Sequence, residues 1–199
     1  MTLFFLPGVG ADPGFWRPVG DHLLSNSDKV YFGWPGLGNQ PADPGVNGYD
    51  DLIALVERQL PDHPVDLLAQ SMGGLIALSL ALRHPARIRR LVLAVTSGGL
   101  DVTRFGAQDW RPDYNCDYPN GATWITGERP DISKHLGEVL QPTLLLWGDA
   151  DPISPVAVGR YLAERLRNGT LHIVEGGGHD LIYRRASEVT GLISTHLTA

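Results

Sequence analysis

The sequence predicts an α/β fold, with a mostly parallel central sheet of about six strands and helices on both faces. Short apolar runs bounded by glycine or proline alternate with longer segments of helical period, which is typical of βαβ units. Several of these runs, such as 91–95 and 143–147, are apolar without alternation. Strands covered by helices on both faces have this pattern.

Six strands and five helices follow from this pattern. The predicted strands are 2–6, 29–33, 65–69, 90–95, 142–147 and 170–174. The predicted helices are 14–24, 49–60, 71–83, 155–167 and 180–197. Residues 75–82 are apolar on nearly every side of their helix, so we expect that helix to be buried in the middle of the molecule.

The segment 98–139 does not follow either period. Prolines and glycines interrupt it repeatedly, yet it contains four large aromatic residues, Trp110, Tyr114, Tyr118 and Trp124. A long irregular segment in a compact domain is usually functional or disordered, and the aromatic residues argue against disorder. We therefore expect a single domain, 1–199, in which 98–139 forms a small lid or pocket wall.

Charge and composition exclude several classes of partner. The net charge is −6 and the acidic residues are scattered, so no basic face is available for nucleic acid. Arg83, Arg87, Arg89 and Arg90 cluster near the predicted end of a helix, where cations suit the helix dipole. No apolar run approaches the roughly 20 residues of a membrane span. We expect a soluble protein without nucleic acid or membrane partners.

Cysteine usage suggests a compartment. Cys116 is the single cysteine, so an intramolecular disulfide and a cysteine pair for zinc are both excluded. There is no H-E-x-x-H motif and no dense group of His, Asp and Glu, which leaves metal chemistry without support. We expect a cytoplasmic protein, and the sequence does not indicate its oligomeric state.

A serine lies where a predicted buried strand runs into the buried helix. In the stretch 66–74, Ser71 stands at this corner and is followed by Gly73 and Gly74. A serine at such an elbow exposes its hydroxyl above the sheet, and the next N–H, from Met72, points toward a developing oxyanion. The alternative is that Ser71 only caps the helix, a common role of serine.

Taken together, these segments resemble the α/β-hydrolase family, in that family's order and over nearly the whole chain. The stretch 69–73 is similar to its G-x-S-x-G pattern, with Ala69 in place of the first glycine. The stretch 6–10 resembles its oxyanion loop, with Pro7 where histidine is usual, and 34–38 resembles its P-G-x-G turn. The resemblance implies Ser71 as nucleophile, and the N–H groups of Val9 and Met72 as oxyanion hole.

The resemblance also implies the acid. Residues 148–155 have the spacing G-x-x-D-x-x-x-P, which selects Asp151 over Asp149. Such an aspartate orients the histidine and stabilises the imidazolium. The alternative for Asp151 is an Asp-Pro turn or a helix cap. Some family members take the acid from the loop after the preceding strand, where this chain has Asp101.

The histidine of the resemblance is His179, because Gly177-Gly178-His179 matches the family's G-G-H after the last predicted strand. The six other histidines lie in helical or strand contexts. Three glycines at 176–178 could form a phosphate cradle, but no G-K-[ST] follows them. A dinucleotide site at Gly8-Val9-Gly10 also fails, because Gly14 falls one position late for G-x-G-x-x-G.

The implied function is that of a serine hydrolase, which cleaves carboxylic esters or thioesters through an acyl-serine intermediate and needs no cofactor or metal. The substrate would be a small molecule, with pocket walls from Phe15, Trp16, Trp110 and Trp124. The short lid favours small or accessible esters over long lipid chains.

Two alternatives stay open. The same triad could perform carbon–carbon bond cleavage, lactone opening or lyase chemistry, which the fold does not distinguish. The second alternative is a ligand-binding protein in which catalysis is vestigial. The presence of Ser71, Asp151 and His179 together argues against it, because a protein that only binds has no need for all three.

Overall fold

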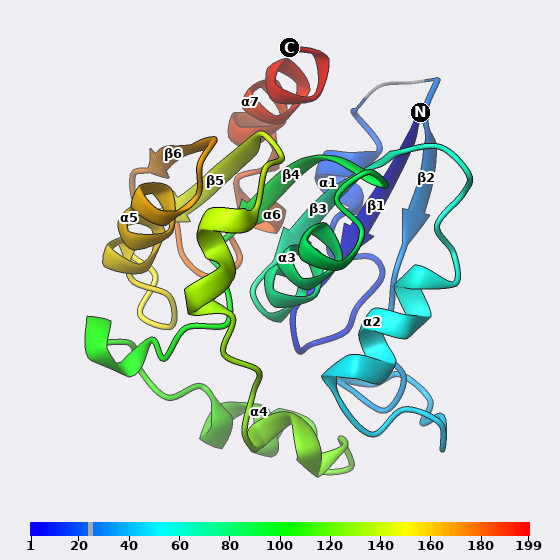
Figure 1. Ribbon diagram of the computed structural model, residues 1–199. Helices are drawn as coiled ribbons and strands as arrows, with labels where there is room; N and C mark the ends of the chain where they lie inside the picture. The colour runs from blue at the N-terminus through cyan, green and yellow to red at the C-terminus, as the bar shows by residue number, and fades with distance from the viewer. Residues whose placement is uncertain (24–25) are drawn as a thin grey trace.

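Six parallel strands form one sheet in the order β2-β1-β3-β4-β5-β6 (Figure 1). The computed structural model describes residues 1–23 and 26–199. The strands are β1 (Thr2–Leu6), β2 (Asp28–Tyr31), β3 (Val65–Gln70), β4 (Ile88–Ala94), β5 (Thr143–Gly148) and β6 (Gly169–Val174). Each predicted strand agrees with an observed one to within two residues, and the predicted α/β class is confirmed.

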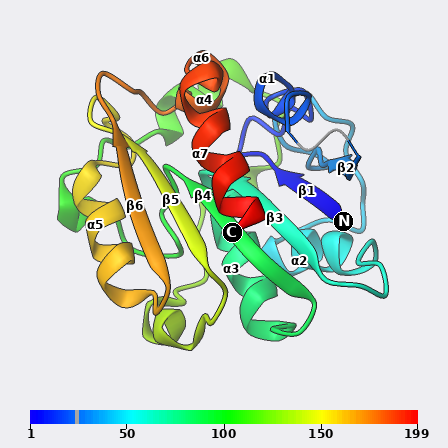
Figure 2. The same ribbon diagram turned by 90° about the horizontal axis from the view of Figure 1, so that it is seen from above.

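Helices cover both faces of the sheet (Figure 2). The long helices are α2 (Tyr49–Glu57), α3 (Met72–Arg83), α5 (Val156–Arg165) and α7 (Ala186–Thr198), and the short ones in this part of the fold are α1 (Arg17–Gly20) and α6 (Leu181–Arg184). Helices α1 and α7 pack together on one face, and α2 and α3 pack together on the other, the face that α5 also covers.

The apolar runs of the sequence form the centre of this sandwich. All residues of β1, β3 and β5 are buried, and ten of the twelve residues of α3 are buried. An apolar strand has no solvated face, so it is stable only where helices cover both sides. This burial holds the carboxyl ends of the central strands in fixed positions.

Two predicted helices differ from the observed ones. The predicted helix 14–24 is much shorter, because α1 spans only Arg17–Gly20, and position 24 lies outside the described residues. The predicted helix 180–197 is two helices, α6 and α7, separated by Arg185 with φ −115° and ψ 27°. The Arg185 side chain donates to the carbonyl of Glu175, a tertiary contact that a sequence period does not report.

The segment 98–139 contains more helix than its sequence indicates. It forms α4 (Arg111–Asp117) and three 3₁₀ helices, η1 (Thr103–Phe105), η2 (Thr123–Thr126) and η3 (Ser133–Glu138). These pieces are too short to generate a sustained hydrophobic period. The green α4 lies beyond the carboxyl ends of the strands in Figure 1.

None of the described helices combines the length and apolar character needed to cross a bilayer.

Candidate active site

The three residues that carry the predicted chemistry follow three different strands. Ser71 comes directly after β3, Asp151 follows β5, and His179 follows β6. In a parallel sheet all carboxyl ends meet at one edge, where open α/β sheets bind their ligands. The topology therefore brings these residues to the same edge, although up to 108 positions separate them in the chain.

Ser71 occupies a strained turn between β3 and α3. Its φ of 51° and ψ of −120° lie outside the regions that serine normally adopts. The neighbouring strand holds it there: the Ser71 N–H donates to the carbonyl of Ala94 at 3.0 Å, and the Thr96 hydroxyl donates to the Ser71 carbonyl at 2.5 Å. The Ser71 hydroxyl makes no cap hydrogen bond to α3, so it is available for other contacts.

The second glycine of the elbow has a clear steric role. A Cβ atom on Gly73 would overlap the carbonyl oxygens of Leu6 and Pro7. The first turn of α3 therefore packs directly against the loop that follows β1. This contact brings the backbone of Met72 and that of Val9 to the same side of the site.

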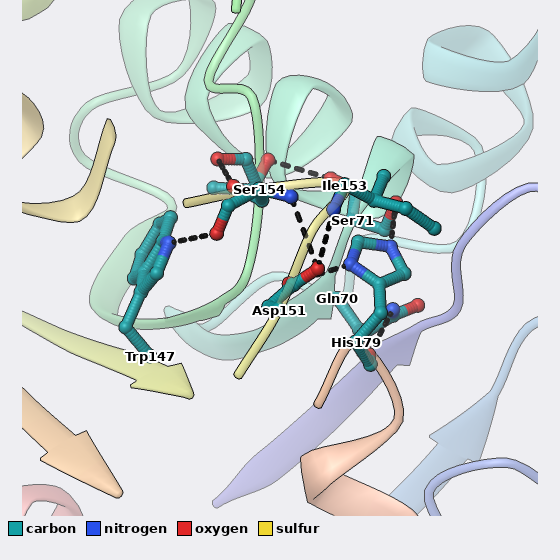
Figure 3. Close-up of polar contacts among 8 residues, drawn as sticks. Gln70, Ser71, Trp147, Asp151, Ile153, Ser154 and His179 are labelled. Carbon is teal, nitrogen blue, oxygen red and sulfur yellow. Dashed lines mark hydrogen bonds and ion pairs between the residues drawn. The ribbon is translucent and has the colours of Figure 1, made fainter. Parts of the chain in front are cut away.

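His179 connects the other two side chains (Figure 3). Its Nε2 lies 3.0 Å from the Ser71 Oγ, and its Nδ1 lies 2.8 Å from the Asp151 Oδ2. An ionised carboxylate only accepts hydrogen bonds, so Nδ1 carries the proton and Nε2 is left to accept the hydroxyl of Ser71. This is the arrangement required for a histidine to act as a general base toward a serine.

The Asp151 carboxylate is held by its own loop. Its side chain is 0% exposed, and its Oδ1 accepts hydrogen bonds from the N–H groups of Ile153, at 2.8 Å, and Ser154, at 3.1 Å. Trp147 of β5 anchors this loop, because its Nε1 donates to the Ser154 carbonyl at 2.9 Å (Figure 3). Such contacts fix the direction in which the other carboxylate oxygen faces His179.

The acid loop and the histidine loop touch through glycine backbones. The Ala150 N–H donates to the carbonyl of Gly177 at 3.0 Å. A Cβ on Gly148 would overlap that carbonyl group, and a Cβ on Gly177 would lie 3.0 Å from the Gly148 Cα. Side chains at these two positions would push His179 away from Asp151.

Two backbone N–H groups near Ser71 have no acceptor. Among the described residues, neither Val9 nor Met72 donates its N–H to a carbonyl or a side chain. The Met72 N–H belongs to the first turn of α3, where N–H groups have no intrahelical acceptor. Val9 and Met72 both line the narrow cavity beside Ser71, so both N–H groups are available for a ligand oxygen.

Two cavities meet at Ser71 and His179. A narrow cavity has a volume of ≈ 40 Å³, and a wide one has a volume of ≈ 570 Å³. Trp110 lines the narrow cavity and Phe15 lines the wide one, as expected for pocket residues.

Trp16 and Trp124 need correction, because neither lines these cavities. Trp16 is in the core beneath the loop after β1, where its Nε1 donates to the Leu6 carbonyl. Trp124 packs edge-on against Tyr49, with ring centroids 5.6 Å apart. The sequence indicated them by their aromatic character and their position, beside the loop 6–10 for Trp16 and within 98–139 for Trp124. Neither signal distinguishes a core position from a pocket wall.

Asp101, the alternative acid, is engaged elsewhere. It is 69% exposed and accepts hydrogen bonds from the Thr103 N–H and hydroxyl, at 3.1 Å and 2.7 Å. These bonds hold the pKa of its carboxyl below the usual value. The aspartate that contacts His179 is Asp151.

Three further polar residues around the site were missed by sequence reasoning. Gln70 donates to the His179 carbonyl, the Ser154 hydroxyl donates to the Thr96 carbonyl at 3.2 Å, and Thr96 in turn contacts Ser71. Only the position of Gln70, at the end of a strand and beside the elbow, could have identified it. No group of three or more His, Cys, Asp and Glu side chains in the described part of the chain is arranged to bind a metal ion.

Comparison with known proteins places this geometry in a family. A family model described as "alpha/beta hydrolase fold" matches residues 2–120, and one described as "TAP-like protein" matches residues 107–199. An esterase structure from Exiguobacterium antarcticum superimposes with a TM-score of 0.81 at 18% identity, covering 100% of this chain and 92% of the other. At that identity the likeness shows the fold.

Curated relatives include a pimeloyl-[acyl-carrier protein] methyl ester esterase of Neisseria meningitidis, 36% identical over 176 residues, which cover 84% of this chain and 61% of that protein. The chain thus spans about three-fifths of the length of that relative. A poly(3-hydroxyalkanoate) depolymerase of Ectopseudomonas oleovorans is 26% identical, over 98% of this chain and 83% of the other. With a family model matching more than half of its residues, the chain belongs to the α/β-hydrolase fold family.

Proposed function

We propose that this chain is a serine hydrolase that cleaves carboxylic esters or thioesters through an acyl-serine intermediate. The observation that carries the proposal is the continuous hydrogen-bonded series from the Ser71 hydroxyl through His179 to the Asp151 carboxylate. A serine hydroxyl is a weak nucleophile on its own, and a correctly oriented imidazole activates it.

In the first half-reaction, the Ser71 Oγ attacks the carbonyl carbon while its proton moves to the His179 Nε2. The imidazolium that forms is stabilised by the Asp151 carboxylate, which accepts the Nδ1 proton's hydrogen bond. The negative charge on the former carbonyl oxygen is accommodated by the N–H groups of Val9 and Met72. Removal of one such donor in other enzymes costs about 10²–10³-fold in kcat.

Departure of the alcohol or thiol completes the first half-reaction: the His179 Nε2 proton passes to the leaving group as the carbon–oxygen or carbon–sulfur bond breaks, and the acyl group stays on Ser71. In the second half-reaction a water molecule gives a proton to the same nitrogen and attacks the acyl carbon, and the carboxylic acid leaves as Ser71 regains its proton. No step in this sequence requires a cofactor.

The relatives support the ester-cleaving reaction. Two of the curated relatives bear names of ester hydrolases, an esterase and a depolymerase of a polyester. Because the chain spans only part of the Neisseria relative, we extend to it the bond that is cleaved and not that relative's substrate.

We also propose that the chain is one domain in which 98–139 acts as the lid or pocket wall. Val102, Trp110 and Arg129 of this segment line the narrow cavity, and Tyr118 lines the wide one. We propose a cytoplasmic location because Cys116 is exposed and unpaired exposed thiols persist in reducing compartments.

The test is covalent labelling with a fluorophosphonate probe. We expect stoichiometric modification of Ser71 in the wild type and none in Ser71→Ala. A matched control is Ser133→Ala, which changes a serine in η3 away from both cavities and should leave the labelling unchanged. A folded wild-type protein that remains unlabelled and hydrolyses no ester would refute the proposal and favour a ligand-binding role.

A further inference from the structure

The two cavities at Ser71 divide a substrate into two parts. Both are lined by Val9, Ser71, Ile153 and His179. The wide cavity extends along the loop after β1 toward Phe15 and Asp180. The narrow one extends between α3 and the segment 98–139, toward Leu75 and Arg129. A carbonyl carbon held at Ser71 therefore has its two substituents directed into spaces of different size and chemistry.

The order of product release assigns these spaces. The alcohol or thiol leaves first, while the acyl group stays bonded to Ser71. A leaving group in the wide cavity departs without passing the acyl-enzyme, whereas one in the narrow cavity would be trapped behind it. The narrow cavity is therefore the acyl site, with ≈ 40 Å³ against ≈ 570 Å³ for the wide cavity.

The wall of the acyl site changes character along its length. Close to Ser71 it is apolar, with Met72, Leu75 and Val95, which suits a short methylene chain. Its other lining residues include Arg129 and Tyr49. A mostly buried arginine in the lining of a narrow cavity is unusual for a site that binds only hydrocarbon, because desolvating a charge without a partner costs free energy.

Arg129 is not committed to a protein partner. Its side chain is only 21% exposed, and its ion pair with the Asp101 carboxylate is long, at 4.0 Å. That carboxylate is already hydrogen-bonded by Thr103. By contrast, the nearby Arg111 donates to both the Thr126 carbonyl and Asp109. Within the described residues, no hydrogen bond from Arg129 is present.

Tyr49 adds a neutral donor beside this cation. Its ring is held edge-on by Trp124, and burial raises the pKa of its hydroxyl, so it remains protonated at neutral pH. A guanidinium and a phenol hydroxyl are both hydrogen-bond donors suited to a carboxylate, which Arg binds through charge-assisted hydrogen bonds.

We propose that the acyl site selects acyl groups of a few carbons that end in a carboxylate, bound by Arg129 and Tyr49. The substrates would then be monoesters or monothioesters of short dicarboxylic acids. This inference rests on the proposed serine hydrolase function. The reaction takes up one water, breaks the bond between the acyl carbon and the alcohol oxygen or thiol sulfur, and releases the alcohol or thiol and the dicarboxylate.

The test compares two esters of the same length and shape. Ethyl hydrogen glutarate carries a terminal carboxylate, and ethyl glutaramate carries a neutral amide in its place. We expect the wild type to prefer the charged ester in kcat/KM by about 10- to 100-fold, the range of a charge-assisted hydrogen bond. Arg129→Met should remove this preference, because it lowers kcat/KM for the charged ester far more than for the neutral ester.

Arg104→Met is the matched control. Arg104 lies in the same segment but stacks on Phe105 and Tyr161 instead of lining the acyl site, so its loss should leave the preference intact. If Arg129→Met and Arg104→Met lost the preference for the charged ester equally, the cause would be a general effect of charge, and the inference would be overturned. Should Arg129→Met fail to fold, inhibition of the wild type answers the same question: glutarate should inhibit at least about tenfold more strongly than the neutral diamide, pentanediamide.

The outcome also separates this inference from the function on which it rests. If Ser71 is labelled and ethyl pentanoate is hydrolysed, but the wild type does not distinguish the charged from the neutral ester, then the acyl-site inference is wrong and the hydrolase proposal stands. If Ser71 is not labelled and no ester is cleaved, the hydrolase proposal itself fails.

Discussion

The amide Nε2 of Gln70 donates a hydrogen bond of 3.1 Å to the backbone carbonyl of His179 (Figure 3). The two residues are 109 positions apart. This bond joins the end of the nucleophile's strand to the loop that carries the histidine. It therefore fixes the backbone of His179 beside the nucleophile. This contact does not depend on the hydrogen bond between the side chains of His179 and Ser71.

Gln70→Leu should lower kcat for a short ester by about tenfold with little change in KM, because displacement of a catalytic group by a fraction of an ångström is costly. Kinetics with 4-nitrophenyl acetate measure this. Gln141→Leu is the matched control, since Gln141 is equally buried and also donates to a carbonyl, that of Pro85. An equal fall in kcat in both variants would assign the effect to stability alone.

Asp151→Asn should reduce kcat by about 10⁴-fold while the thermal unfolding midpoint changes little, since the amide favours the wrong imidazole tautomer. The same substitution at Asp101, which bonds only with Thr103 and lies 4.0 Å from Arg129, should keep the turnover of neutral esters within about twofold. If Asp101→Asn proved to be the inactivating change, Asp151 would not be the acid.

Gly148→Ala should destabilise the fold by about 1–3 kcal/mol, because the added methyl group overlaps the Gly177 carbonyl and must displace it. Gly191→Ala adds the same methyl group in the middle of α7, where no atom lies within 4 Å. That change should stabilise by about 0.5–1 kcal/mol. Urea unfolding measures both, and a neutral Gly148→Ala would contradict the close approach of the two loops.

His196 should make the protein less stable in acid. Desolvation by burial, followed by the charge of Arg90, lowers its pKa below the usual 6.5, so the folded chain takes up this proton at lower pH than the unfolded chain. Below about pH 6.5 the unfolded state binds more protons, and the free energy of unfolding falls as the pH falls.

His196→Gln should weaken this dependence between pH 7.5 and pH 5.5, since glutamine can still donate to the Leu91 carbonyl that His196 contacts but does not titrate. The same change at the exposed His22 is the control. An unaltered slope in His196→Gln would show that another group causes the acid sensitivity.

Acyl-chain length should decide turnover. An acyl site of ≈ 40 Å³ accommodates a short chain, so 4-nitrophenyl esters of two to four carbons should exceed long-chain esters in kcat/KM by at least about tenfold. A preference for a long-chain ester would contradict the small acyl site. It would also contradict the expectation that the short segment 98–139 favours small or accessible esters over long lipid chains.

Sequence patterns alone predict the order of the strands along the chain and, with the family resemblance, the residues of the proposed triad. Apolar runs without alternation require cover on both faces, and parallel strands place all their carboxyl ends at one edge. Ser71, Asp151 and His179 each follow such a run, and the family resemblance selected these three residues from the others near the strand ends. Family resemblance added the choice of Asp151 over Asp101.

The other side chains around the site could be found only once the chain was folded. Gln70 and Thr96 make hydrogen bonds with residues distant in sequence, and Arg129 lines the narrow cavity beside Ser71; no local period reports such positions. Trp16 and Trp124 were predicted to line the pocket but pack elsewhere, because an aromatic side chain suits the core as well as a pocket. Packing between segments far apart in the chain decides between the two, because the free energy of burial depends on what covers a residue and not on its neighbours in sequence.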